Sequence, residues 1–188
     1  MELSILHTLN NFLARHDGLS DPIERFATAS QLLFIVALVA ALVWRPTRRS
    51  AVIATIATPM ALVAGAILSA VVTRARPFVD HPEVHRLISH AADPGFPSDH
   101  ATASFAIATA LLFGVRKVGV GLLAVATLLA VARVAVGVHW PTDVLAGAAL
   151  GVAGACVARA LWELVCPRLE ARWQPLGALL DAPARPTA

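Results

Sequence analysis

Long apolar runs limit what this chain can fold into. Four of them, residues 26–44, 51–72, 118–138 and 144–165, each have about the 20 residues that a helix needs to cross a bilayer. A fifth run, 101–115, reaches that length when the residues just before it are included. We therefore expect five membrane-spanning helices.

The composition supports this expectation. Of the 188 residues, 57% are apolar and 14% are charged, whereas a soluble domain has about 25% charged residues. Most soluble folds are therefore excluded. The net charge of +3 and the pI near 9.6 do not indicate a nucleic-acid partner, because most basic residues flank apolar runs, as in membrane proteins. The oligomeric state is left open.

Three segments are expected along the chain. Residues 1–19 form an N-terminal amphipathic helix, ended by Gly18, that lies at the membrane interface or packs on other parts of the protein. Residues 20–166 form the membrane-embedded domain, in which Gly147, Gly151 and Ala155 make a stripe of small residues for close helix packing. Residues 167–188 form a polar cytoplasmic tail.

Basic residues predict the orientation. Clusters at 45–49 and 116–117 and in the tail share one side of a five-span topology, which the positive-inside rule makes cytoplasmic. Residues 73–97 and the turn at 138–142 then face outward. Four arginines lie on that side or near it, against the rule: Arg74, Arg76, Arg86 and Arg133. An anionic ligand would explain arginines in such places.

Three polar stretches meet at the outer ends of the spans: 74–78, 96–100 and 133–143. In the third, Pro141 begins a helix, so the carboxylate of Asp143 can reach back to the imidazole of His139. It would orient the ring and leave the other nitrogen free as a nucleophile or a base. The alternative is a capping aspartate beside an interfacial histidine.

The other two stretches add groups that suit a phosphate ester. Ser98 is a candidate N-cap at a helix start, where phosphate binds, and His100 is a candidate general acid. Arg74, Arg76 and Arg133 offer guanidinium groups for phosphate oxygens; the alternatives are a capped helix and snorkelling arginines. Together these residues predict a phosphoryl-transfer site without metal ligands in the usual spacing, and we expect no cofactor. His81, His85 and His90 leave a metal site open, although their spacing fits no strong zinc pattern.

At these residues the chain resembles the type 2 phosphatidic acid phosphatase superfamily, over about residues 20–166. The family pattern is Lys-x6-Arg-Pro, Pro-Ser-Gly-His and Ser-Arg-x5-His-x3-Asp; the matching motifs here are Arg76-Pro77, Pro97-Ser98-Asp99-His100 and Ala132-Arg133-x5-His139-x3-Asp143. Three positions depart from it, because Ser69, Asp99 and Ala132 stand where the family has Lys, Gly and Ser. The missing lysine removes one phosphate contact, for which Arg74 is the candidate replacement.

The resemblance implies an all-α, polytopic membrane bundle of about five to six helices with an acid phosphatase/vanadium haloperoxidase-like core. It implies phosphohistidine chemistry with His139 as nucleophile, His100 as acid and Asp143 as the partner of His139. The substrate-binding set is Arg74, Arg76, Ser98, Asp99 and Arg133, although no role follows for Asp99.

The form of the second and third motifs is similar to that of the BcrC-like undecaprenyl-diphosphate phosphatases. It implies hydrolysis of a polyprenyl diphosphate, among membrane lipids, on the outer face of the bacterial cytoplasmic membrane. The alternatives are a phosphatidate or phosphatidylglycerol-phosphate phosphatase of the same superfamily and a non-enzymatic membrane protein that binds an anion.

Overall fold

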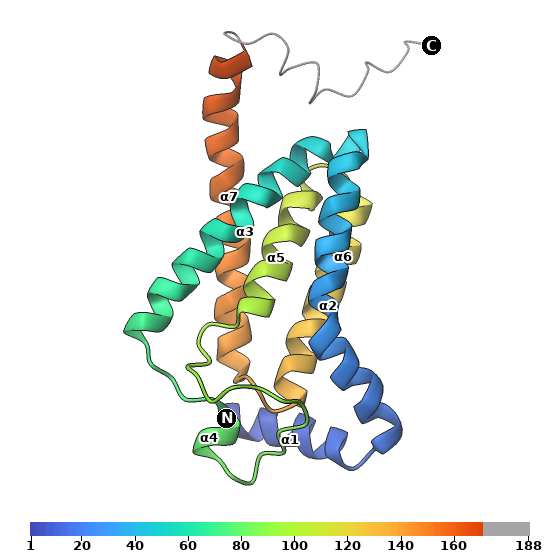
Figure 1. Ribbon diagram of the computed structural model, residues 1–188, viewed down its shortest axis with the longest axis vertical. Coiled ribbons are helices and arrows are strands. Elements are labelled where there is room, and N and C mark those ends of the chain that lie inside the picture. The colour runs from blue at the N-terminus through green and yellow to red at the C-terminus, as the bar shows by residue number, and fades with distance from the viewer. Residues whose placement is uncertain (171–188) are drawn as a thin grey trace.

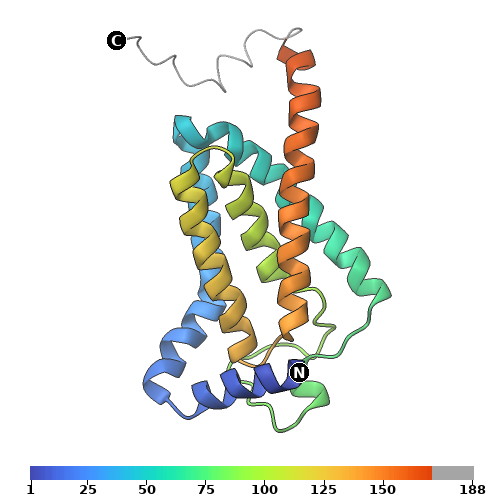
Figure 2. The same cartoon turned by 180° about the vertical axis from the view of Figure 1, so that it is seen from behind.

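The chain folds into a bundle of helices, as the computed structural model in Figures 1 and 2 shows. The structure describes residues 1–170, which contain helices and loops and no strand. The four long helices are α2 (Asp17–Val43), α3 (Arg45–Val71), α6 (Arg116–Ala135) and α7 (Pro141–Glu170), and they surround the shorter α5 (Asp99–Leu112). Two further helices, α1 (Glu2–Ala14) and α4 (Pro77–Asp80), lie at one end of the bundle (Figure 1). The predicted all-α bundle is confirmed.

The long helices identify a membrane protein. Helices α2, α3, α6 and α7 are each long and apolar enough to cross a bilayer. Their outer surfaces carry large apolar side chains that the protein leaves exposed, such as Leu32, Ile67 and Leu128. A large apolar surface of this kind is unfavourable in water and favourable in contact with lipid tails.

Helix α5 differs from the five-span expectation. Its 14 residues extend about 21 Å, which is less than the hydrocarbon thickness of about 30 Å. Ten of these residues are buried, so α5 is apolar because other helices enclose it. The residues before Ser98, which were expected to complete a span, form a loop instead. In that loop the Gly95 N–H donates to the Arg74 carbonyl and the Ser98 N–H to the Asp143 carbonyl.

The N-terminal helix packs on the rest of the protein. Helix α1 lies across the end of the bundle (Figures 1 and 2) and buries Leu6, Asn10 and Leu13. The break before α2 falls at Arg15 and His16, and Gly18, which was expected to end the first helix, lies inside α2. A single glycine costs a helix only about 1 kcal/mol, so packing of the helix can override it.

Helices α5 and α7 lie very close together. A Cβ atom built on Gly147 would lie 2.5 Å from the Ser98 carbonyl oxygen, and one built on Gly151 would overlap the Thr102 carbonyl. Ala155, one turn further along α7, is fully buried. This confirms that the small-residue stripe serves close packing. Of the expected tail, residues 167–170 continue α7 and the rest lies outside the described residues.

Candidate active site

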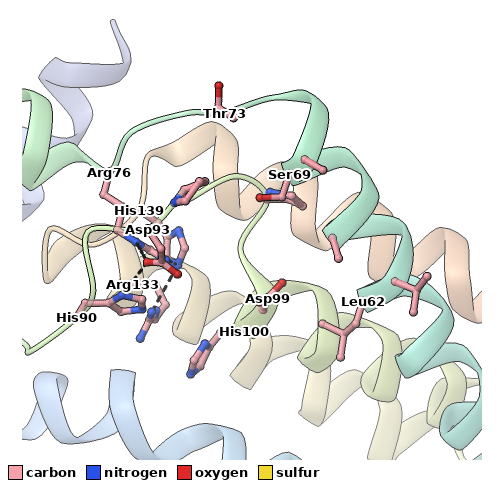
Figure 3. Close-up of a pocket in the computed structure, with 15 residues that line it drawn as sticks. Leu62, Ser69, Thr73, Arg76, His90, Asp93, Asp99, His100, Arg133 and His139 are labelled. Carbon is pink, nitrogen blue, oxygen red and sulfur yellow. Dashed lines mark hydrogen bonds and ion pairs between the residues drawn. The ribbon is translucent and has the colours of Figure 1, made fainter.

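A cavity of about 810 Å³ opens at the end of the bundle where α3 ends and α5 begins (Figure 3). Its polar side is formed by residues from four separate segments: Arg76, His90, Asp93, Asp99, His100, Arg133 and His139. Its other wall is one face of α3, with Leu62, Val63, Ala66, Ser69 and Ala70, and Thr73 just after that helix. Titratable groups thus meet an apolar helix face in one cavity.

His139 lies in the turn between α6 and α7, and its side chain is 4% exposed. Its Nδ1 is 3.0 Å from the carbonyl oxygen of Gly95. Because a carbonyl oxygen only accepts hydrogen bonds, Nδ1 carries the proton and Nε2 is left with a lone pair. Burial, together with the charges of Arg133 and Arg76, lowers the pKa of His139 well below its ordinary value. The ring is therefore neutral at neutral pH, which is the form that acts as a nucleophile.

Two buried arginines face the free nitrogen of His139. Arg76 Nη1 and Arg133 Nη2 each lie 3.4 Å from His139 Nε2. Arg76 is held by bonds to the Val138 carbonyl and to Asp93, and Arg133 by a bond to the Ala27 carbonyl. Among the described residues, the buried Arg133 Nε has no hydrogen-bond partner. The pair can hold the oxygens of a phosphoryl group beside Nε2.

Asp143 is fully buried in the first turn of α7. Its Oδ2 accepts the backbone N–H of Trp140 at 2.8 Å, which caps the helix. The same Oδ2 lies 3.6 Å from His139 Nδ1. The carboxylate is thus next to the imidazole as expected, but Nδ1 donates its hydrogen bond to the Gly95 carbonyl, and the distance of 3.6 Å to Asp143 is longer than a hydrogen bond.

The remaining predicted residues differ in position. His100 and Asp99 line the cavity from the first turn of α5, and Ser69 lines it from α3. Ser98 is fully buried beside them as the N-cap of α5, where its Oγ accepts the Ala101 N–H. The described residues place no ion pair on Asp99.

Arg74 does not line the cavity. Its guanidinium donates to Asp143 Oδ1 at 3.1 Å and to Glu2 Oε2 at 2.8 Å, and it stacks over the ring of Trp140. It therefore contacts the side of Asp143 that faces the N-terminal helix.

Three residues at the site were not predicted as part of the phosphoryl-transfer site, although His90 was considered as a metal ligand. Gly95 acts through its backbone, which no side-chain motif reveals. His90 packs edge-on against His139, with ring centroids 6.2 Å apart, and Asp93 accepts from Arg76 at 3.0 Å. Hydrogen bonding and the charge of Arg76 outweigh partial burial and lower the pKa of Asp93. The one available signal was the density of polar residues in 73–97.

The three histidines considered as metal ligands do not converge. His81 pairs with Glu83, the backbone of His85 bonds to Asn10, and His90 faces the cavity. Within residues 1–170, no group of three His, Cys, Asp or Glu side chains is arranged to hold a metal ion.

Comparisons with known proteins agree with this geometry. Residues 50–165 match the family model described as the PAP2 superfamily. The chain is 38% identical over 137 residues to undecaprenyl-diphosphatase BcrC of Bacillus subtilis (strain 168), which covers 71% of this chain and 70% of that protein. It is 35% identical over 118 residues to the decaprenylphosphoryl-5-phosphoribose phosphatase of Mycobacterium tuberculosis, covering 62% and 64%.

Among solved structures, the crystal structure of Aquifex aeolicus LpxE is similar, with a TM-score of 0.74 and 25% identity over 85% of this chain and 94% of that one. The match to the family model contains all the cavity-lining residues, whereas α1 and α2 precede it.

Proposed function

Since this chain belongs to the PAP2 superfamily, we propose that it hydrolyses undecaprenyl diphosphate to undecaprenyl phosphate and inorganic phosphate. The chain is an integral membrane phosphatase. Its similarity to an undecaprenyl-diphosphatase over 71% of its length supports this choice of substrate.

One observation carries the proposal, namely the two-sided cavity. At one end, the guanidinium groups of Arg76 and Arg133 provide positive charge beside Nε2 of the neutral His139. The opposite wall is the apolar face of α3, which leans away from α5 at this end of the bundle (Figure 1). A substrate with a diphosphate head and a long hydrocarbon tail matches both sides, whereas a water-soluble phosphate ester would leave the α3 face uncovered.

The first step is attack on the terminal phosphorus. Nε2 of His139 forms the N–P bond while the bond from phosphorus to the bridging oxygen breaks. Burial and the charge of Arg133 lower the pKa of His100 to about 4 in the protein without substrate, and the negative charge of the diphosphate favours its protonated form. His100 then gives its proton to the bridging oxygen, and undecaprenyl phosphate leaves. Arg76 and Arg133 stabilise the charge on the transferred phosphoryl oxygens, and the Gly95 carbonyl with Asp143 keeps Nδ1 protonated and the ring in place.

The second step releases the phosphate. A water molecule attacks the phosphohistidine, His100 takes the proton of that water, and the N–P electron pair returns to Nε2. The start of α5, which Ser98 caps, lies at this cavity, and a helix N-terminus favours an anion such as the phosphate. No step uses Asp99, although it lines the cavity.

We further propose that the membrane-embedded domain spans residues 20–166 and that the cavity faces the outside of the bacterial cytoplasmic membrane. Arg45 and Arg116 begin helices at the end of the bundle opposite the cavity (Figure 1). The positive-inside rule supports a cytoplasmic location for that end.

Phosphate release from undecaprenyl diphosphate by the purified chain and its His139→Ala variant tests the mechanism. Wild type is expected to turn over and to accumulate an acid-labile phosphoenzyme, and His139→Ala to lose both. His16→Ala, at the surface between α1 and α2, is the matched control and keeps both. Turnover retained in His139→Ala would overturn the phosphohistidine mechanism. Faster turnover of phosphatidylglycerol phosphate or phosphatidate than of undecaprenyl diphosphate would overturn the proposed substrate.

A further inference from the structure

The N-terminal helix carries a carboxylate that reaches the active-site aspartate through one arginine. Glu2, in the first turn of α1, lies 72 residues from Arg74 in the sequence, and Arg74 in turn bonds to Asp143. Helix α1 lies before the residues that match the family model. The contact therefore links the active site to a part of the chain outside the match.

We propose that Glu2 and Arg74 are positioning residues for Asp143, and that Arg74 is not a phosphate ligand. The inference rests on the proposed roles of His139 and Asp143. It gives Arg74 a different role from the phosphate contact that the sequence suggested.

The geometry of Arg74 supports this role. One terminal nitrogen, Nη1, donates to Asp143 Oδ1 at 3.1 Å, and the other, Nη2, donates to Glu2 Oε2 at 2.8 Å. The face of the guanidinium lies over Trp140, 5.0 Å from the ring centroid. Two carboxylates and an aromatic ring thus hold the group from three directions, and it does not line the cavity.

Glu2 is itself fixed at the start of α7. Its Oε1 accepts the backbone N–H of Thr142 at 3.0 Å and also the Thr142 hydroxyl. Partial burial raises the pKa of Glu2, but the hydrogen bonds from Arg74 and Thr142 outweigh it, so the pKa lies below its ordinary value. Glu2 is therefore a carboxylate at neutral pH, and its charge balances that of Arg74.

The consequence concerns the buried carboxylate of Asp143. Oδ2 accepts a hydrogen bond from the Trp140 N–H, and Oδ1 accepts one from Arg74. These two bonds prevent the carboxylate from rotating away from His139. Without Arg74, Oδ1 of this fully buried group would lose its cationic partner. Without the Glu2 carboxylate, the Arg74 guanidinium would still bond to Asp143 through Nη1, but its Nη2 would lose the negative charge that holds it.

Steady-state kinetics on the full chain, with undecaprenyl diphosphate as substrate and inorganic phosphate as competitive inhibitor, separate the two roles of Arg74. By analogy with residues that orient metal ligands, whose loss changes activity by about 10–100-fold, Arg74→Ala is expected to lower kcat by that range and Glu2→Gln by about tenfold. The inhibition constant of phosphate should stay unchanged in both variants. The double variant should match Arg74→Ala, since both residues act through the same contact.

A phosphate-binding role makes the opposite prediction. Arg74→Ala would then weaken inhibition by phosphate and raise KM, and this result would overturn the proposal. Arg74→Lys should give an intermediate kcat with unchanged inhibition, because a single ammonium group cannot bridge two carboxylates as a guanidinium fork does. It provides a test if Arg74→Ala fails to fold.

The matched control is Glu83→Gln. Glu83 is an exposed carboxylate that also pairs with a side chain of α1, His7, and with His81, but it forms no ion pair with Arg74 and does not hydrogen-bond to Asp143. It is expected to keep the wild-type kcat. If the wild-type chain does not hydrolyse the diphosphate, the proposed function fails; if wild type is active and Glu2→Gln and Arg74→Ala match it, this inference fails.

Discussion

The contact between Gly147 and Ser98 allows a steric test of how α7 positions the start of α5. In Gly147→Ala, the new Cβ would lie 2.5 Å from the Ser98 carbonyl oxygen and 3.0 Å from Thr102 Oγ1, whereas ordinary contacts begin at 3.4 Å. The Ser98 oxygen is held by the N–H and the hydroxyl of Thr102, so it cannot turn aside. The first turn of α5 must therefore move away from α7 by about 0.9 Å.

This displacement affects the proposed acid directly, because His100 lies two residues after Ser98. A misplacement of about 1 Å can cost about 100-fold in rate, so we expect kcat to fall by about 10–100-fold. Overpacking also costs about 1–3 kcal/mol of stability. Phosphate release from undecaprenyl diphosphate and the unfolding temperature of the purified protein measure the two effects.

Two other glycines give matched controls. A Cβ on Gly121 in α6 would meet nothing within 4 Å, so Gly121→Ala should keep full activity. A Cβ on Gly154 would lie 2.9 Å from Ala61 Cβ, between α7 and α3, so Gly154→Ala should lower the unfolding temperature with little change in kcat. Wild-type kcat in Gly147→Ala would refute the reasoning, and so would an equal loss of kcat in Gly154→Ala.

Three further changes have expected outcomes. Asn10→Ala removes three hydrogen bonds to the backbones of His85 and Ala135. Each buried group left without a partner should cost about 1–3 kcal/mol of stability, so the unfolding temperature should fall. An unchanged unfolding temperature would mean that α1 docks without these bonds. Because His139 has a lowered pKa in the folded state, the unfolded chain binds more protons once the pH falls below about 6.5. The unfolding temperature should therefore drop with acidification, and less steeply in His139→Phe; equal slopes would contradict the lowered pKa. Arg133→Lys replaces the planar guanidinium group, which can donate two parallel hydrogen bonds, by a single ammonium charge. It should weaken inhibition by inorganic phosphate about tenfold. An unchanged inhibition constant would mean that phosphate does not bind at Arg133.

The sequence located the site because its residues lie at helix ends. Once the apolar runs are assigned to helices in a bundle, the polar residues of three helix ends must share one end of it. His100, Arg133 and His139 meet there for this reason, and Arg76 joins them from the loop after α3. This reasoning needs the order and direction of the helices and no detail of their packing.

Contacts made by the backbone or by distant side chains could not be found in this way. The carbonyl of Gly95 sets the proton position on His139, but every residue has a carbonyl. The partner of Arg74 is Glu2, and nothing in a sequence motif relates the two positions. Helix α5 was taken as a full span because hydropathy does not distinguish a helix buried in protein from one that faces lipid.

The sequence presented helix capping and catalytic orientation as alternatives for Asp143, and in the proposed mechanism the same carboxylate performs both. Its Oδ2 caps α7 through the Trp140 N–H and lies 3.6 Å from the ring of His139. Because His139 directly precedes Trp140, the bond that fixes the start of the helix also limits where the imidazole can be. A buried carboxylate with this task needs a cation on its other oxygen, and Arg74 provides it from outside the cavity. The positive charge that serves the aspartate is thereby kept apart from the two arginines that face the proposed phosphate.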